Sequence, residues 1–186
     1  MKKNIIIVLV VLLVIGCSIG VKIYLDKNLD KQKEDLNNII EKYGSVKKES
    51  VELSVAKFNT EIMDNNVGNP ASYDYMTQEN NLYWFALLDN VYLYVKPENY
   101  TGNKDKDITE IMTIHYSDNE SIALNYVKAL IKSNNDTLTD SDIKYLMNEA
   151  KTLSKDKKNA NNGKGISVSY VSDGKIIEYQ VIRLHK

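Results

Sequence analysis

The stretch LYWFALLDNVYLYVK, residues 82–96, decides the fold. Residues 82–88 and 91–96 are rich in β-branched and aromatic side chains, which favour strands, and Asp89-Asn90 forms a two-residue turn between them. Unbroken pairing across this turn gives one face with Trp84, Ala86, Leu88, Val91, Leu93 and Val95, and another with Tyr83, Phe85, Leu87, Tyr92 and Tyr94. Both faces are apolar, whereas an antiparallel sheet usually exposes one face to water. The hairpin is therefore either covered on both sides or offers an aromatic surface.

Further aromatic residues flank the hairpin, at Tyr73, Tyr75 and Tyr100. Two interpretations of this cluster remain open. The rings pack as a core beneath helices, or they form a surface that binds glycans, peptides or proteins, because aromatic side chains give a large contact area at low entropic cost. On the second interpretation, the candidate binding surface consists of Tyr83, Phe85, Tyr92 and Tyr94.

One helix is predicted before the hairpin, because Val51, Val55, Phe58 and Ile62 are spaced as a single helix face. Asn65-Asn66 ends this helix. After the hairpin, residues 108–116 are predicted to form a third strand.

Two more helices and a closing hairpin follow. Capping boxes predict where the helices begin, Ser117 with Glu120 and Thr139 with Asp142. The apolar faces are Ile122, Ala123, Tyr126, Val127, Leu130 and Ile131 in the first helix and Ile143, Leu146, Met147, Ala150 and Leu153 in the second. Strands over residues 166–171 and 175–183 close around an Asp173-Gly174 turn. This order predicts an α+β domain, with an antiparallel sheet of about five strands and helices packed on one side.

The N-terminal residues 1–25, MKKNIIIVLVVLLVIGCSIGVKIYL, have the charged and apolar regions of a secretory signal. Val14-Ile15-Gly16-Cys17 resembles a bacterial lipobox, which makes Cys17 a candidate for lipidation. Alternatively, the apolar run continues to Leu25 as an uncleaved transmembrane helix. About 21 residues at about 1.5 Å each span roughly 31 Å, the thickness of a bilayer core. Both interpretations attach the chain to membrane lipid through its N-terminus.

Residues 26–45 are predicted to form a charged stalk with a short helix, and residues 46–186 a single extracytoplasmic domain. Lys2 and Lys3 favour an N-terminus inside the cell, although the lysines that follow the apolar run, beginning with Lys22, count against that orientation. The very short N-terminal tail before a signal-like segment favours a soluble domain on the outer face of the membrane.

Composition limits the function classes. The chain has 186 residues and a formal net charge of −1, so no global field attracts nucleic acid. Arg183 is the only arginine, which argues against a dedicated phosphate site. A single cysteine excludes an intrachain disulfide. Heavy use of lysine, asparagine, isoleucine and tyrosine is typical of low-GC bacteria, and in general style the chain resembles small anchored proteins of Gram-positive cells.

Catalytic motifs are incomplete. Residues 45–48 fit S-x-x-K and residues 117–119 fit S-D-N, a combination that resembles penicillin-binding enzymes and β-lactamases. The third element, K-T-G, is absent, and the chain is too short for that fold. His115 and His185 are the only histidines, and the sequence names no orienting partner for either.

Metal and phosphate motifs also fail. Asn103, Asp105, Asp107 and Glu110 form an oxygen-rich loop that lacks the glycine and glutamate of a calcium-binding EF-hand loop. The segment at residues 163–165, Gly-Lys-Gly, lacks the glycine spacing and the Ser or Thr of a P-loop. We therefore predict neither a metal nor a cofactor.

The combination of an anchor with a domain that lacks catalytic signatures predicts an accessory or binding protein of the bacterial cell envelope. Its expected partners are another envelope protein or a wall polymer. Two alternatives remain. One is a small envelope enzyme or inhibitor whose site is assembled from residues distant in sequence. The other is a cytoplasm-facing membrane tether in signalling or conjugation.

Overall fold

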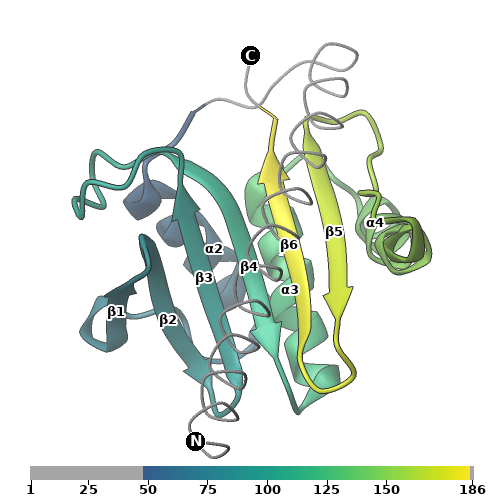
Figure 1. Ribbon diagram of the computed structural model, residues 1–186, viewed down its shortest axis with the longest axis horizontal. Helices are drawn as coiled ribbons and strands as arrows, with labels where there is room; N and C mark the ends of the chain where they lie inside the picture. The colour runs from purple at the N-terminus through teal and green to yellow at the C-terminus, as the bar shows by residue number, and fades with distance from the viewer. Residues whose placement is uncertain (1–47, 185–186) are drawn as a thin grey trace, which may run out of the picture. The chain divides into compact units, whose positions relative to one another are not determined.

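The computed structural model describes residues 48–184, which form one α+β domain. All strands pair antiparallel in one sheet with the order β1-β2-β3-β4-β6-β5 (Figure 1). The six strands are β1 (Met76–Glu79), β2 (Leu82–Leu88), β3 (Val91–Pro97), β4 (Thr109–Tyr116), β5 (Ile166–Ser172) and β6 (Ile177–Arg183). The predicted α+β class with an antiparallel sheet is confirmed for the described domain, the sheet has one strand more than the five predicted, and the extra strand is β1. Its sequence, MTQE, escaped prediction because it has no apolar alternation.

The helices are α2 (Val51–Asp64), α3 (Glu120–Asn134) and α4 (Asp140–Leu153), with short 3-10 turns η1 (Tyr73–Tyr75) and η2 (Ser154–Asp156). Figure 1 shows α2 and α3 on the same face of the sheet and α4 beside β5 at its edge. Within residues 48–184, none of the helices has the length and apolar character needed to cross a membrane. The predicted anchor and stalk, together with Cys17, Ser45 and His185, lie outside the described residues.

Helix α2 follows the prediction closely. Ser50 caps its N-terminus by accepting a hydrogen bond from the Leu53 N–H, and the predicted apolar face is buried. At its C-terminal end, Asn66 adopts a left-handed conformation with φ of 49°, which asparagine tolerates better than most residues. The Val67 N–H then donates to the Ile62 carbonyl at 3.0 Å. This Schellman ending satisfies the last carbonyls of the helix.

The capping prediction is wrong for α3 and confirmed for α4. Asn119 is the N-cap of α3, with φ of 57° and no side-chain cap bond. The Ser117 N–H, which the predicted box would pair with Glu120, donates instead to the Asn90 carbonyl of the β2–β3 turn at 3.2 Å. Pairing with a neighbouring turn therefore delays the start of α3. At α4, Thr139 and Asp142 form the predicted reciprocal box.

Two side chains of the predicted apolar helix faces are not buried. Ile122 in the first turn of α3 is 40% exposed, and Leu153 at the end of α4 is half-buried. Both lie in the terminal turns of their helices. The predicted turn at Asp173-Gly174 lengthens to the four residues that separate β5 from β6.

A β-bulge in β2 overturns the predicted division of the hairpin faces. Leu88 pairs with Val91 across the predicted turn, but Ala86 pairs with Tyr92, so Leu87 is an extra residue on its strand. The register before the bulge shifts by one residue, which moves every earlier side chain of β2 to the opposite face. Tyr83, Phe85 and Leu87 therefore share a face with Val91, Leu93 and Val95, and Trp84 and Ala86 share the other with Tyr92 and Tyr94.

The chain enters the described domain beside the end of its last strand. The Thr109 N–H donates to the Glu49 carbonyl at 2.9 Å, and the Glu49 carboxylate forms a buried ion pair with Arg183 at 2.7 Å and another contact with Lys57. Arg183 Nε donates to Asn134 Oδ1 at 2.7 Å, which ties both ends to α3. Burial raises the pKa of Glu49, but the contacts with Lys57 and Arg183 outweigh it and hold the pKa below its ordinary value.

Candidate functional site

The four aromatic residues of the predicted binding surface separate onto two faces. Tyr83 and Phe85 are fully buried on the face that α2 and α3 cover. Tyr92 and Tyr94 are half-buried on the second face, on which none of the helices in residues 48–184 lies (Figure 1). The predicted four-residue surface therefore does not exist as one patch, because the bulge in β2 turns half of it inward.

The second face carries an aromatic strip made of Trp84, Tyr92, Tyr94 and His115. The rings of Trp84 and Tyr94 have centroids 4.2 Å apart, and Tyr94 and His115 are 5.0 Å apart. Tyr92 completes the strip, 6.3 Å from Tyr94. These rings contact one another across three neighbouring strands, which leaves them half-buried rather than fully open to a ligand.

His115 has a carboxylate partner that the sequence did not name. Its Nδ1 lies 3.0 Å from Glu178 Oε1, because the two residues pair across β4 and β6. Gln180 Nε2 donates to the other carboxylate oxygen at 3.4 Å, and Ser169 Oγ donates to Gln180 Oε1 at 3.3 Å. The strip thus continues into a polar network across β6 and β5.

Two polar groups of the strip, Trp84 Nε1 and the Tyr94 hydroxyl, differ in their surroundings. Trp84 Nε1 is buried and has no hydrogen-bond partner among the described residues. Burial raises the pKa of Tyr94 to about 12, with a smaller contribution from the negative charge of Glu178. Neither group is arranged for proton transfer near neutral pH.

The oxygen-rich loop before β4 is organised around Asp107, which is 1% exposed. Its carboxylate accepts hydrogen bonds from the Tyr83 hydroxyl at 2.6 Å, from the Thr101 N–H at 3.0 Å and from the Gly102 N–H at 3.2 Å. Burial raises the pKa of Asp107, but these bonds outweigh it and lower the pKa below its ordinary value. The residue that looked like a metal ligand thus holds the loop to the core.

Other acidic side chains of this loop form ion pairs. Asp105 lies 2.8 Å from Lys104, and Glu110 lies 3.1 Å from Lys96. Within residues 48–184, no three His, Cys, Asp or Glu side chains converge as metal ligands would. The loop therefore has no cation-binding geometry in the described part of the chain.

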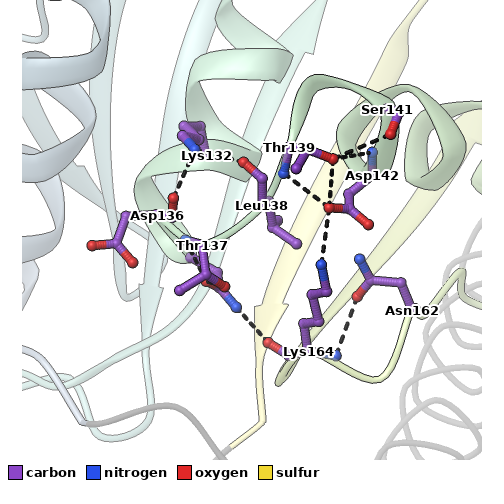
Figure 2. Close-up of polar contacts among 10 residues, drawn as sticks. Lys132, Asp136, Thr137, Leu138, Thr139, Ser141, Asp142, Asn162 and Lys164 are labelled. Atoms are coloured by element: carbon purple, nitrogen blue, oxygen red, sulfur yellow. Dashed lines mark hydrogen bonds and ion pairs between the residues drawn. The ribbon is translucent and has the colours of Figure 1, made fainter.

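The Gly-Lys-Gly segment lies beside the start of α4 (Figure 2). Lys164 Nζ pairs with Asp142 at 3.0 Å, and the Lys164 carbonyl accepts a hydrogen bond from Asn135. Lys164 therefore joins the loop before β5 to the α3–α4 connection. Its ammonium group is already neutralised by a carboxylate, which leaves no phosphate cradle.

A cleft of about 660 Å³ opens between the C-terminal end of α2, α3 and α4. Its floor is apolar, with Ala129, Ile143 and Met147 buried and Val67 half-buried. This volume is within the range of about 300–1,000 Å³ that is typical of ligand sites. Its size and apolar floor make the cleft a candidate ligand site.

The rim of the cleft is rich in amides and amines. Asn65 and Asn66 come from the end of α2, Asn125 from α3 and Asn148 from α4. Three lysines, Lys128, Lys132 and Lys144, and two acids, Glu61 and Asp140, complete the rim. A polar rim around an apolar floor gives orientation and affinity to a bound ligand.

Sequence reasoning missed the cleft. Asn125, Lys128 and Lys132 follow one another at helical spacing beside the buried face of α3, and such a stripe normally indicates a solvated face. The asparagines that end α2 indicate only a helix stop. The surplus of asparagine at four separate positions was the available signal, but nothing in the sequence shows that these positions meet.

Comparisons with known proteins give no precedent for either surface. The strip and the cleft are therefore interpreted from their own geometry. No protein-family model, curated protein or solved structure matched this chain.

Proposed function

We propose that this chain is a membrane-anchored binding protein of the bacterial cell envelope, whose domain stands on the outer face of the membrane. Residues 1–25 serve as the anchor and residues 26–45 as a charged stalk. The partner is another envelope protein or a wall polymer, and its binding requires no metal or cofactor.

The cleft between α2, α3 and α4 carries this proposal. An asparagine side chain donates and accepts hydrogen bonds but does not titrate, so it recognises a ligand without transferring protons. Four of the rim residues are asparagines, which makes the rim suited to holding a ligand. With Tyr83 and Phe85 in the core, the cleft is a better candidate than the aromatic surface.

Site-directed photo-crosslinking in intact cells tests the cleft. A photoreactive residue at Asn148 on the rim is expected to give an adduct, whereas the same residue at the exposed Lys175, in the turn between β5 and β6, gives none. Adding Asn125→Ala, a change at an exposed rim residue within α3, to the Asn148 variant is expected to reduce the adduct. Equal labelling from both positions, or no labelling from Asn148, contradicts a binding role for the cleft.

Protease treatment of intact cells tests the orientation. Cleavage of the domain is expected if it lies outside, and a domain cut only after lysis supports the alternative of a cytoplasm-facing tether. Metabolic lipid labelling of the wild type and of Cys17→Ala distinguishes the two anchors. Label that depends on Cys17 indicates a lipoprotein, and no label indicates an uncleaved helix.

The contact between His115 and Glu178 favours a second candidate, a small envelope enzyme. A histidine oriented by a carboxylate at 3.0 Å has the geometry of a general base. The pair lies on the sheet, however, and not among the residues that line the cleft. A hydrolase activity of the purified full chain that His115→Ala abolishes would establish this alternative.

A further inference from the structure

We propose that the cleft binds an extended peptide bearing a carboxylate, so that the envelope partner is a protein or peptide rather than a phosphate-bearing polymer. This inference rests on the proposed function, because it names the ligand class of the same cleft. Four features carry it: fixed walls, an amide rim, an uncompensated positive charge and the absence of arginine from the lining.

Two of the three helices that line the cleft, α3 and α4, are joined by a connection whose polar contacts are shown in Figure 2. Lys132 Nζ donates to the carbonyls of Asp136 at 2.7 Å and Leu138 at 2.5 Å, and the Leu138 side chain is buried. The Thr139 N–H donates to Asp142 Oδ2 at 2.9 Å, which fixes the first turn of α4. A cleft whose walls are already ordered loses less entropy when a ligand binds.

The rim matches the polar groups of a peptide backbone. Each amide side chain presents a donor and an acceptor, and each peptide unit presents the same pair. Asn66 at one wall and Asn125 and Asn148 at the others surround the apolar floor, whereas the Asn65 amide already donates to Glu61. A peptide in the cleft therefore satisfies amides on several sides while one apolar side chain fills the floor.

The charges of the rim leave a positive excess. Lys144 has no ion-pair or hydrogen-bond partner among residues 48–184, and Lys128 has only a weak contact, 3.4 Å from Asn125 Oδ1. Lys132 is engaged by carbonyl groups, and Glu61 accepts a hydrogen bond from Asn65 at 3.3 Å. Hydrogen bonds to neutral groups remove no charge, so three ammonium groups face two carboxylates at the rim, and a ligand with one carboxylate completes the balance.

Phosphate fits the rim less well. A phosphate diester offers only acceptors, which leaves the asparagine carbonyls without donors. The first turn of α4 uses its own side chains for capping and places Asp140 at the rim, so no free helix N-terminus attracts an anion of that kind. The cleft has no arginine, the residue best suited to phosphate.

Binding of fluorescent probes to the full chain in lipid nanodiscs tests the inference. One probe is a short N-acetylated peptide with a central leucine and a free C-terminal carboxylate, and its match is the same peptide with an amidated C-terminus. A third probe is an oligomer of glycerol phosphate. The acidic peptide is expected to bind about tenfold more tightly than its amide, because charge-assisted hydrogen bonds are roughly twice as strong as neutral ones.

Two lysine variants test whether the preference for a carboxylate depends on the cleft. Lys144→Gln is expected to reduce the preference for the carboxylate several-fold, because it removes one of the positive charges of the rim. Lys175→Gln, which removes an equivalent charge far from the cleft, preserves the preference. The fluorescence of Trp84, the only tryptophan, verifies that each variant is folded.

Equal binding of the two peptides, or tighter binding of the glycerol phosphate oligomer, overturns the inference. Absence of binding to all three probes overturns it as well. In each case the photo-crosslink from Asn148 tests the proposed function independently. A retained crosslink leaves the cleft as a binding site for another ligand class.

Discussion

The two faces of the β2–β3 hairpin are built from similar side chains, yet their surroundings differ. Tyr83 and Phe85 are fully buried under α2 and α3, and the Tyr83 hydroxyl donates to the buried Asp107 carboxylate. Tyr92 and Tyr94 are half-buried on the second face, and their hydroxyls have no protein partner among residues 48–184. The comparison teaches that an aromatic residue's role depends on its register and on the partner of its polar group, not on its residue type.

The largest expected difference between the faces concerns packing. Phe85→Ala is expected to lower the free energy of unfolding by about 3–5 kcal/mol, since it opens a cavity in the core. Tyr92→Ala removes a ring of similar size from the half-buried face and is expected to cost clearly less. Urea unfolding of the full chain in detergent, followed by Trp84 fluorescence, measures both. Equal losses would mean that the second face is packed as tightly as the core.

The next largest effect concerns the hydroxyl group of one tyrosine on each face, Tyr83 and Tyr94. Tyr83→Phe removes a donor from the buried Asp107 carboxylate and is expected to cost about 1–3 kcal/mol. Tyr94→Phe removes a hydroxyl that has no protein partner in the described domain, and its unfolding free energy should remain close to that of the wild type. The same unfolding assay compares them. A larger loss for Tyr94→Phe would contradict the assigned difference.

Asp107, which accepts a hydrogen bond from Tyr83 of the covered face, is expected to make the stability of the domain depend on pH in the acid range. The pKa of Asp107 is lowered in the fold, so its contribution to stability is present above the ordinary pKa of about 4 and is lost as the pH falls through the lowered value. Asp107→Asn should therefore flatten the loss of stability in this acid range. Asp89→Asn in the exposed β2–β3 turn is the matched control, and urea unfolding at several pH values gives both slopes.

The smallest expected effect is a titration on the second face. Tyr94 should ionise near pH 12, and any stability linked to its neutral form is present below about pH 10 and lost as the pH rises through about 12. Glu178→Gln removes a nearby negative charge and should lower the pKa of Tyr94 slightly. Ultraviolet titration of phenolate, with Tyr94→Phe to assign the signal, measures the shift. An upward shift would contradict the role assigned to Glu178.

Local signals in the sequence predicted much of the fold. The apolar stripe of α2, its ending at Asn65-Asn66, the Thr139/Asp142 cap and the Asp89-Asn90 turn depend on residues close together in the chain. The predictions that failed depend on distant partners. Ser117 pairs with the β2–β3 turn instead of capping α3, and the extra residue in β2 is visible only in its pairing with β3.

The candidate site was less predictable than the fold. Of the four predicted surface residues, Tyr92 and Tyr94 lie in the aromatic strip, whereas Tyr83 and Phe85 lie in the core. Trp84 replaces them on the second face. The rim of the cleft combines asparagines and lysines from three helices, and no periodic pattern marks residues that approach one another only after the helices pack.

The sequence by itself determined the α+β class, the approximate extent of the helices and the expectation of an N-terminal anchor. These depend on periodicity, turn chemistry and hydrophobic length, which are properties of consecutive residues. Tertiary structure alone decided which aromatic rings are buried, how Asp107 is used and where the cleft opens. These depend on pairing register and on contacts between elements, and a one-residue bulge is enough to exchange the two faces of a strand.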